Sequence, residues 1–390
     1  MIKAKEFKMK VFLSVVSFIF FFIACSGEKN TEQSAFTNPF TLEKNQGIFY
    51  FMQGKLGEKE QKLYLSIEQK TEGNLSVNAS LLGDKELYFS GFLKDDNTSF
   101  VLHAQNTQEK DIIEGQISFD TLFIPTIEAN VTQAKQQIPA HFMLAQNKVN
   151  VFDFVENTAQ EKKSVDGASF TSTLSDEGFL IPSNSKLSLE AIARINQKIG
   201  LSAQNIKELQ AKLMKIQQEK FAKEEKFSFY TEHINSLSPY YIDDKILVFS
   251  SLEYVYLGGA HGIPHLSSLI FSLQDGSEIS GKSKDLFENT SDEALLNLVL
   301  EALSVYNETS SFKDTQGVKR FIEWDDKNKN GFVALPENFF ITEKGVEFVY
   351  QPYEIASFAE GHISIYIAFD KLAPFVKKGS PLAYLFKQKR

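Results

Sequence analysis

The chain has 390 residues, of which 50 are acidic and 41 basic, so its formal net charge is −9. We expect no nucleic-acid partner, because phosphate backbones require a clustered basic surface that an acidic chain does not favour. Cys25 is the only cysteine, which excludes an intramolecular disulfide and a cysteine-based metal cluster. The length suggests two domains behind a targeting segment.

The N-terminus has the pattern of a bacterial lipoprotein signal peptide. A lysine-rich start, Met1–Lys10, precedes a short apolar run, Val11–Ala24. A hydrocarbon core of roughly 30 Å needs about 20 apolar residues, so this run is better explained as a targeting signal. The segment Phe22–Ser26 resembles a lipobox, and we expect cleavage before Cys25 and lipidation of its thiol. A plain signal peptide with a chance cysteine, or an uncleaved anchor, are the alternatives.

These features predict where the chain resides and how it is divided. We expect attachment to the membrane through lipid at Cys25 in the cell envelope, and in a Gram-negative cell Ser26 favours the outer membrane over the inner one. The expected segments are a signal peptide over 1–24, a lipidated tether over 25–40, a β-meander domain over 41–147 and an α+β domain over 148–390.

The region 41–147 alternates apolar and polar side chains in short runs separated by turn residues about every 12 positions, which is typical of an antiparallel meander. The alternating apolar positions include Leu63, Leu65, Ile67, Leu75, Val77, Ala79, Leu87, Phe89, Phe100, Leu102, Ile117, Ile127, Ala129, Val131, Phe142 and Leu144. Because only one side of each run is apolar, each strand exposes its other side to water. The sequence therefore predicts an all-β sandwich or barrel.

From about residue 148 the pattern becomes mixed. An apolar stripe predicts a helix behind Ser188, a second helix begins at Ser202, and Thr290 with Glu293 forms a capping box that opens a third. Apolar runs predict strands over 246–256, 269–273, 339–341, 346–350 and 363–367. Helices among antiparallel strands indicate an α+β domain with helices packed on a sheet.

Four stretches of this second region, 257–262, 271–276 with the later 284–287, 335–342 and 349–361, carry a family resemblance. They include Leu-Gly-Gly-Ala-His-Gly from Leu257 and Gln-Pro-Tyr-Glu-Ile-Ala from Gln351. Their order and spacing resemble the extracytoplasmic domain of unknown function shared by the anti-sigma factor RsiV and the PdaC-type deacetylases.

The resemblance implies an α+β fold over about 165–385, with 165–230 as its helical N-terminal part. In the anti-sigma factor this domain recognises lysozyme. The deacetylase chemistry lies in a separate catalytic domain, whose metal-binding Asp and His motifs are absent from this sequence.

The same stretches contain the candidate ligand-binding or catalytic residues Gly258, Gly259, His261, Tyr353, Glu354 and Glu360. His261 with Glu354 could form an acid/base pair if the fold brings them together. A glycine loop between two strands explains the first group equally well, because glycine accepts positive φ. A glutamate that anchors a loop explains Glu354 without any chemistry.

A second pattern resembles a calcium-binding loop. Asp326, Asn328 and Asn330 alternate before Gly331, and Glu337 follows at the position of the bidentate ligand. An EF-hand requires helices on both sides, whereas Pro336 precedes Glu337 and a strand is expected next. A polar surface turn is therefore the alternative to calcium binding, and no other cofactor is expected.

The leading hypothesis is a lipid-anchored envelope module that binds or senses a protein or cell-wall ligand, such as a lysozyme-type hydrolase, peptidoglycan or another glycan. One alternative is a hydrolase of envelope polymers that uses His261 and a carboxylate such as Glu354. Another is a purely structural lipoprotein. The sequence contains no complete catalytic motif, so enzymatic activity is not the favoured interpretation.

Overall fold

The computed structural model describes residues 38–387, apart from 72–73, 83–86, 106–110, 134, 166–167, 201–207, 209–210, 213, 216–218, 220–228 and 325–330. The predicted lipidation site Cys25, most of the predicted second helix and the first three calcium-loop ligands lie outside the described residues. No described helix combines the length and the apolar character that a membrane span would need.

The N-terminal part is an eight-stranded antiparallel barrel. After a short 3-10 turn, η1 (Pro39–Thr41), its strands are β1 (Gln46–Leu56), β2 (Lys59–Thr71), β3 (Asn74–Leu82), β4 (Leu87–Leu93), β5 (Ser99–Ala104), β6 (Ile112–Phe119), β7 (Pro125–Gln133) and β8 (Gln136–Leu144). Each pairs with the next, and β1 pairs with β8 from Met52↔Leu144 to Leu56↔Ala140, which closes the barrel. The predicted meander is confirmed, and of the two predicted closures the structure has the barrel.

The barrel core follows from the alternation in the sequence. Ile67, Val77, Phe89, Leu102 and Val131 are each at most 2% exposed and belong to one hydrophobic cluster inside the barrel. Because successive side chains of a strand point to opposite faces, the residues between them form a polar outer surface. Burial of this interior is the main contribution to the stability of the barrel.

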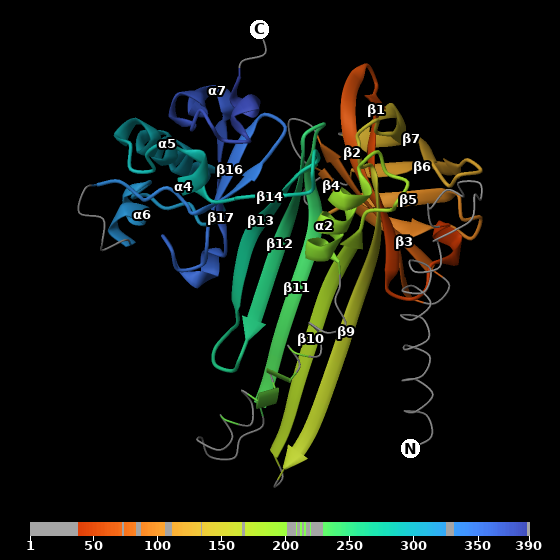
Figure 1. Cartoon of the computed structure of the whole chain (residues 1–390), viewed down its shortest axis with the longest axis horizontal. Coiled ribbons are helices and arrows are strands. Elements are labelled where there is room, and N and C mark those ends of the chain that lie inside the picture. Colours follow the sequence, from red (N-terminus) through yellow and green to blue (C-terminus); the bar gives the residue numbers. More distant parts are fainter. Residues whose placement is uncertain are drawn as a thin grey trace. The chain divides into compact units, whose positions relative to one another are not determined.

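The sheet continues beyond the barrel, because β1 also pairs with β9 (Val151–Val165). Then follow β10 (Ala168–Leu180), β11 (Phe229–Ile242), β12 (Ile246–Tyr256), β13 (Ile263–Ser272) and the short β14 (Glu278–Ile279). All pairs are antiparallel except β10 with β11. Figure 1 shows β9 to β13 running side by side as long strands.

This extension corrects one expectation. The region 165–230 was expected to be helical, yet 168–180 is strand β10. The predicted first helix is confirmed as α2 (Leu189–Ile199), with Ser188 as its N-cap, whose Oγ accepts from the Ala191 N–H. A parallel pair needs a long crossover connection, and the chain between β10 and β11, including α2, supplies it.

One side chain fills the place where β10 and β11 separate. Their pairing ends at Asp176↔Asn235, and the next residue, Glu177, accepts hydrogen bonds from the Leu237 N–H at 3.0 Å and the Ser236 Oγ–H at 2.6 Å. Burial raises the pKa of the Glu177 carboxyl above its usual value. The carboxylate thus stands in for the backbone acceptor that the neighbouring strand no longer provides.

The C-terminal part adds a three-stranded antiparallel sheet of β15 (Asn338–Ile341), β16 (Gly345–Tyr350) and β17 (Ile363–Ala368). Its short helices are α4 (Ser283–Leu286), α6 (Lys319–Trp324) and α7 (Phe369–Leu372), with 3-10 turns η2 (Phe358–Glu360), η3 (Ala373–Phe375) and η4 (Ala383–Phe386). The longest helix is α5 (Glu293–Thr309). Its cap is Asp292 rather than the predicted Thr290, since Asp292 Oδ1 accepts from the Ala294 and Leu295 N–H groups.

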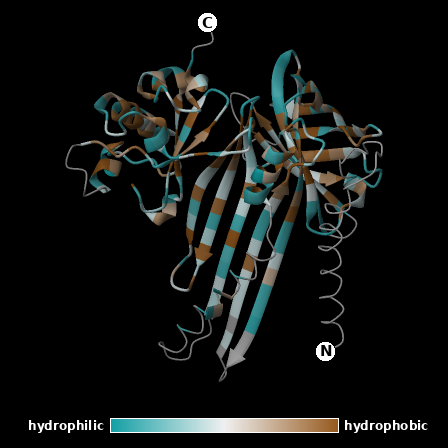
Figure 2. Cartoon of the chain, viewed as in Figure 1, coloured by the Kyte–Doolittle hydropathy of each residue, from teal (hydrophilic) through white to brown (hydrophobic). Residues whose placement is uncertain are grey.

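The first residues of β12 pack into two hydrophobic clusters. Ile246, Leu247, Val248 and Phe249 are all at most 1% exposed. Ile246 and Val248 pack into the C-terminal core, whereas Leu247 and Phe249 pack into an aromatic cluster that also contains Phe51, Tyr64 and the apolar face of α2. Strand β9 becomes more hydrophilic away from these clusters, as its colouring in Figure 2 shows.

Candidate functional site

The predicted glycine loop is the connection between β12 and β13. Gly258 and Gly259 have φ values of 90° and 111°, which side chains with a Cβ rarely adopt. A Cβ on Gly262 would lie 2.4 Å from the ring of Tyr254, so that position requires close backbone approach. The Tyr256 hydroxyl donates to the Gly259 carbonyl at 2.9 Å, which ties the loop to the last residue of β12.

His261 projects from this loop onto the segment that follows β16. Its Nε2 lies 2.9 Å from the Tyr353 hydroxyl, and its Nδ1 lies 3.0 Å from the Gly262 carbonyl. Because a carbonyl can only accept, Nδ1 carries the proton, and the Tyr353 hydroxyl donates to Nε2. The imidazole also stacks on Phe358, with ring centroids 3.6 Å apart and planes inclined by 15°. The structure thus brings together His261 and Tyr353, which are 92 positions apart in the sequence.

Tyr353 is held in an unusual conformation. Its φ is 72°, in the left-handed region where a bulky residue is a true outlier, and its side chain is 51% exposed. The indole of Trp324, 47% exposed, donates to the Tyr353 carbonyl at 3.4 Å. Strained residues that the surroundings hold in place cluster at functional sites. We call the group His261, Trp324, Tyr353 and Phe358 the aromatic surface.

Glu354 does not take the place that the acid/base hypothesis gives it. Its Oε2 accepts from the Gln351 N–H at 2.7 Å, a contact that fixes the turn preceding Tyr353. The Gln351 side chain in turn bonds both backbone groups of Leu266 on β13, at 2.9 and 2.8 Å. Among the described residues, no carboxylate hydrogen-bonds to His261. Glu354 therefore anchors the loop, which is the alternative that the sequence left open.

Glu360 forms a buried ion pair that the sequence did not reveal. Its Oε1 lies 2.7 Å from Arg320 Nη1, and the two side chains are only 8% and 14% exposed. Arg320 Nε also donates to Asn307 Oδ1 on α5 at 2.9 Å. Glu360 belongs to the same 3-10 turn as Phe358. The pair therefore ties α6 to the turn whose phenyl ring supports His261, and Glu360 is a positioning residue.

His362 follows the ion pair and is also partly enclosed. Burial lowers the pKa of its imidazole, and the nearby His265 lowers that pKa further. Its Nε2 is buried and has no hydrogen-bond partner in the part of the chain that the structure describes. A neutral ring suits this environment, because burial penalises the charged form.

The calcium-loop prediction stays a prediction. Asp326, Asn328 and Asn330 lie outside the described residues, and Glu337 forms an ion pair with Lys282 at 3.3 Å. The Glu337 carbonyl also accepts from the Ser283 N–H at 2.8 Å. Within the described ranges, no group of three or more His, Cys, Asp or Glu side chains is placed to hold a metal ion.

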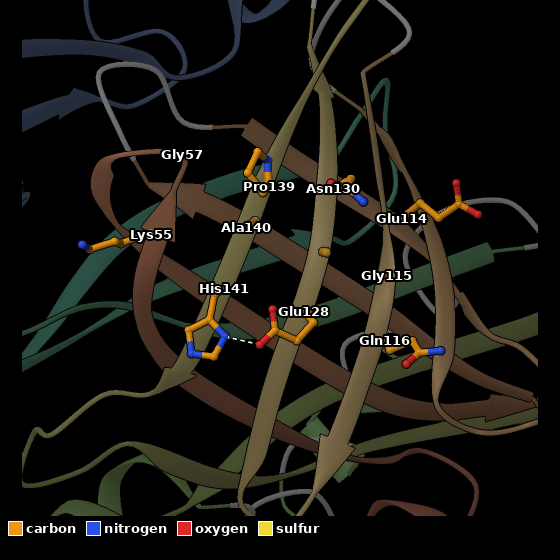
Figure 3. Close-up of a pocket in the computed structure, with 11 residues that line it drawn as sticks. Lys55, Gly57, Glu114, Gly115, Gln116, Glu128, Asn130, Pro139, Ala140 and His141 are labelled. Atoms are coloured by element: carbon orange, nitrogen blue, oxygen red, sulfur yellow. Dashed lines mark hydrogen bonds and ion pairs between the residues drawn. The ribbon is translucent and has the colours of Figure 1, made fainter.

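A separate polar groove lies on the outer face of the barrel, and sequence reasoning did not identify it. In one row across the strands His141 of β8 lies opposite Lys55 of β1 and Glu128 of β7, and Glu128 lies opposite Gln116 of β6. His141 Nδ1 and Glu128 Oε1 are 2.5 Å apart. Figure 3 shows these two side chains turned toward each other, with Asn130 and Pro139 farther along the same strands. We call this the barrel groove. The sequence feature that could have indicated this groove is the set of polar residues that alternate with the buried positions of these strands.

Comparisons with known proteins match part of the chain. Residues 284–370 match the family model described as "Protein of unknown function (DUF3298)", a range that includes Arg320, Tyr353, Glu354 and Glu360 but not His261. No curated protein matches the chain.

Two solved structures of DUF3298 proteins resemble the chain. One from Bacteroides fragilis NCTC 9343 is 20% identical, with a TM-score of 0.43 over 60% of this chain and 97% of that one. Another from Pseudomonas aeruginosa PAO1 is 12% identical, with a TM-score of 0.39 over 58% and 94%.

Proposed function

We propose that the chain is a lipid-anchored binding module of the bacterial cell envelope, whose α+β region over 148–390 recognises a protein or cell-wall ligand through the aromatic surface. The observation that carries the proposal is Tyr353, an exposed ring in a strained backbone conformation, held by His261, Phe358 and Trp324. Exposed tyrosine and tryptophan supply large contact area at low entropy cost and are enriched among binding hot spots.

The chemistry of the site favours recognition over catalysis. Among the described residues, the side chain that hydrogen-bonds to His261 is Tyr353, through its hydroxyl, and a phenol does not orient an imidazole as a base in the way a carboxylate does. The hydrolase alternative required His261 beside a carboxylate. We therefore do not propose an enzyme.

The resemblance to the extracytoplasmic domain of RsiV and PdaC-type proteins suggests the ligand class, with a lysozyme-type hydrolase first and peptidoglycan second. A formal net charge of −9 would steer a cationic protein toward this chain and lower its affinity at high salt.

A capture experiment tests the binding proposal. The full chain in detergent should be retained by immobilised lysozyme or by insoluble peptidoglycan at low salt, and retention on lysozyme should fall as salt is raised. A reporter protein of similar net charge controls for retention by charge alone. No retention on either ligand at low salt would overturn the proposal.

The lipid anchor has its own test. Replacing Cys25 by Ser removes the only thiol and should shift the protein from the membrane fraction to the soluble fraction of the cell. Metabolic labelling with a fatty acid should mark the natural chain and leave C25S unlabelled. Equal labelling of the two would contradict lipidation at this position.

A further inference from the structure

One end of the barrel is where the described chain begins. The ring of Phe40, in η1, packs edge-on against Phe119 at the end of β6, with the ring centroids 5.4 Å apart. Phe119 lies opposite Pro125 at the start of β7, and the next residue of β7, Thr126, lies opposite Met143 near the end of β8. Because these contacts pass from strand to neighbouring strand, Phe40 and Met143 belong to the same end of the barrel.

The tether connects this end to the proposed lipid anchor. Residues 26–37 separate Cys25 from Asn38, and since an extended chain covers at most about 3.6 Å per residue, the tether spans at most about 45 Å. The end of the barrel that carries η1 can therefore contact the bilayer surface without stretching the tether. An anchored chain thus keeps a membrane within reach of this end.

Three large apolar side chains are exposed at this end. Phe40, Leu122 and Met143 are 41%, 46% and 52% exposed. The turn between β6 and β7 presents Leu122, because Asp120 Oδ1 accepts from the N–H groups of Leu122 and Ile124 at 2.8 and 2.9 Å and so fixes the backbone on both sides of it. On entering the boundary between lipid headgroups and acyl chains, where the apolar side chains of interfacial segments lie, these three would leave water.

Beside them, a cavity of about 350 Å³ combines apolar side chains with two lysines. Ile124 and Leu144 line it from the barrel, and Lys148 and Lys186 line it from the connections that follow β8 and β10. The Lys186 N–H donates to the Lys148 carbonyl at 3.0 Å, so the two lysines belong to directly bonded segments. Among the described residues that line the cavity there is no carboxylate, and no described carboxylate pairs with either ammonium group.

Ser185 adds an unused polar group to this cavity. Its Oγ is buried and has no hydrogen-bond partner in the described part of the chain. A hydroxyl and two ammonium groups together suit an oxyanion, and the apolar side chains of the same cavity suit a hydrocarbon attached to it. An anionic phospholipid joins these two parts in one molecule, whereas an inorganic anion or an alkane supplies only one. The residues that we call the tether face are Phe40, Leu122, Met143, Lys148, Ser185 and Lys186.

From these contacts we propose that the tether face docks on a bilayer that contains anionic phospholipid. Its apolar side chains enter the interfacial layer, and its two lysines with Ser185 bind the phosphate of a lipid headgroup. The inference rests on the membrane attachment of the proposed function, and it adds a contact that needs no thioether at Cys25. Such a contact fixes how the barrel stands on the bilayer, which a tether alone leaves free.

The test uses the unlipidated mature chain, made without residues 1–24 and with Cys25→Ser, so that vesicle binding reports the tether face alone. The described fold lies wholly within the residues that this protein keeps. At low salt it should co-sediment with vesicles of phosphatidylglycerol and phosphatidylcholine in equal parts, and bind about tenfold more weakly to phosphatidylcholine alone. The overall acidity of the chain opposes the first result, so general attraction does not explain it. No binding to the mixed vesicles, or equal binding to both kinds, would overturn the proposal.

Variants assign the binding to the tether face. Lys148→Gln together with Lys186→Gln should weaken binding to the mixed vesicles by about tenfold and remove the preference over phosphatidylcholine, because each lysine near an anionic surface adds to the attraction. Leu122→Asp places a charge in the interfacial layer and should weaken binding to both kinds of vesicle. Unchanged binding of either variant to the mixed vesicles would overturn the assignment.

The matched control is Lys59→Gln together with Lys135→Gln. Both lysines are exposed, and they lie where β1 joins β2 and where β7 joins β8, at the opposite end of the barrel. This variant removes the same charge and should bind vesicles as the unsubstituted chain does, so an equal loss would reduce the effect to net charge and contradict the proposal. Failure here is distinguishable from failure of the proposed function, because fatty-acid labelling at Cys25 and retention on lysozyme are measured without vesicles.

Discussion

The barrel and the C-terminal region present their polar groups in different ways. On the barrel, the polar groups of the groove are outward positions of regular strands, such as Glu128 between the buried Ile127 and Ala129. In the C-terminal region, Tyr353 and His261 project from loops that need positive φ, a backbone-bonded glutamine and a buried ion pair to hold them. A strand surface is fixed by the alternation of its side chains, whereas a loop surface must be fixed by specific supports.

The largest expected effect tests whether these two regions unfold together. Phe249 is fully buried in the aromatic cluster that joins the strand extension to outer residues of the barrel such as Phe51 and Tyr64. Phe249→Ala should lower the free energy of unfolding by about 3–5 kcal/mol, in a single urea transition. Phe92→Ala, at a residue 60% exposed on β4, should change it by less than about 0.5 kcal/mol. Two separate unfolding transitions in the natural chain would show that the barrel and the C-terminal region unfold independently.

The next effect compares a buried ion pair with an exposed one. Arg320→Ala leaves the buried carboxylate of Glu360 without its cation and should cost about 3 kcal/mol. Lys62→Ala removes the pair between Lys62 and Glu343, whose side chains are each 39% exposed, and should cost less than about 1 kcal/mol. Chemical denaturation measures both. Equal losses of unfolding free energy in the two variants would show that the buried Arg320–Glu360 pair stabilises the fold no more than an exposed pair does.

A pH effect of intermediate size follows from the lowered pKa values of His362 and His233, both caused first by burial. Each folded pKa lies below the unfolded value of about 6.5, so between the two the unfolded chain binds more protons. The contribution of each neutral imidazole to the free energy of unfolding is fully present above about pH 6.5 and is lost as the pH falls through the folded pKa.

His362→Gln should therefore reduce the decrease in stability between pH 7.5 and pH 5, and adding His233→Gln should reduce it further. Denaturation midpoints at both pH values provide the measurement, because the slope separates titration from any constant loss of packing. An unchanged slope in the double variant would contradict the burial of these rings in the folded chain.

The smallest stability effect concerns the strained tyrosine. Tyr353→Gly relieves the positive φ, so its unfolding free energy should stay within about 1 kcal/mol of the natural value in spite of the lost contacts. Tyr366→Gly, in regular strand β17 and 50% exposed, should lose about 1 kcal/mol, since glycine weakens strand interiors. If Tyr353→Gly lost more unfolding free energy than Tyr366→Gly, the contacts of the Tyr353 ring would stabilise the loop by more than the positive φ destabilises it.

Much of the barrel was predictable because its strands are buried on one side only. Ile127, Ala129 and Val131 alternate with polar residues and all point inward. Strand β9 was missed because its outer half is almost entirely polar. Thr158 and Gln160, for example, follow Asn157 without an apolar alternation. The sequence also lacks a sign that β1 pairs with β8 and β9 at once.

For the candidate site, the residues were predictable but their partners were not. The glycine loop between two strands is confirmed, and the aromatic contact of His261 with Tyr353 joins two of the predicted residues. The positive φ at Tyr353 turns the neighbouring Glu354 toward Gln351 instead, and no local pattern encodes that rotation. Arg320 was not singled out, because a lone arginine on a short helix carries no signal of its burial.

The most direct test of binding through the aromatic surface is the affinity of the full chain in detergent for lysozyme, measured for two matched variants. Tyr353 and Tyr366 are 51% and 50% exposed, so replacement by alanine removes a similar exposed ring from each site. We predict that Tyr353→Ala weakens binding by about 30-fold, as expected for a hot-spot residue, and that Tyr366→Ala binds as the natural chain does. Equal affinities of the two variants would contradict the account.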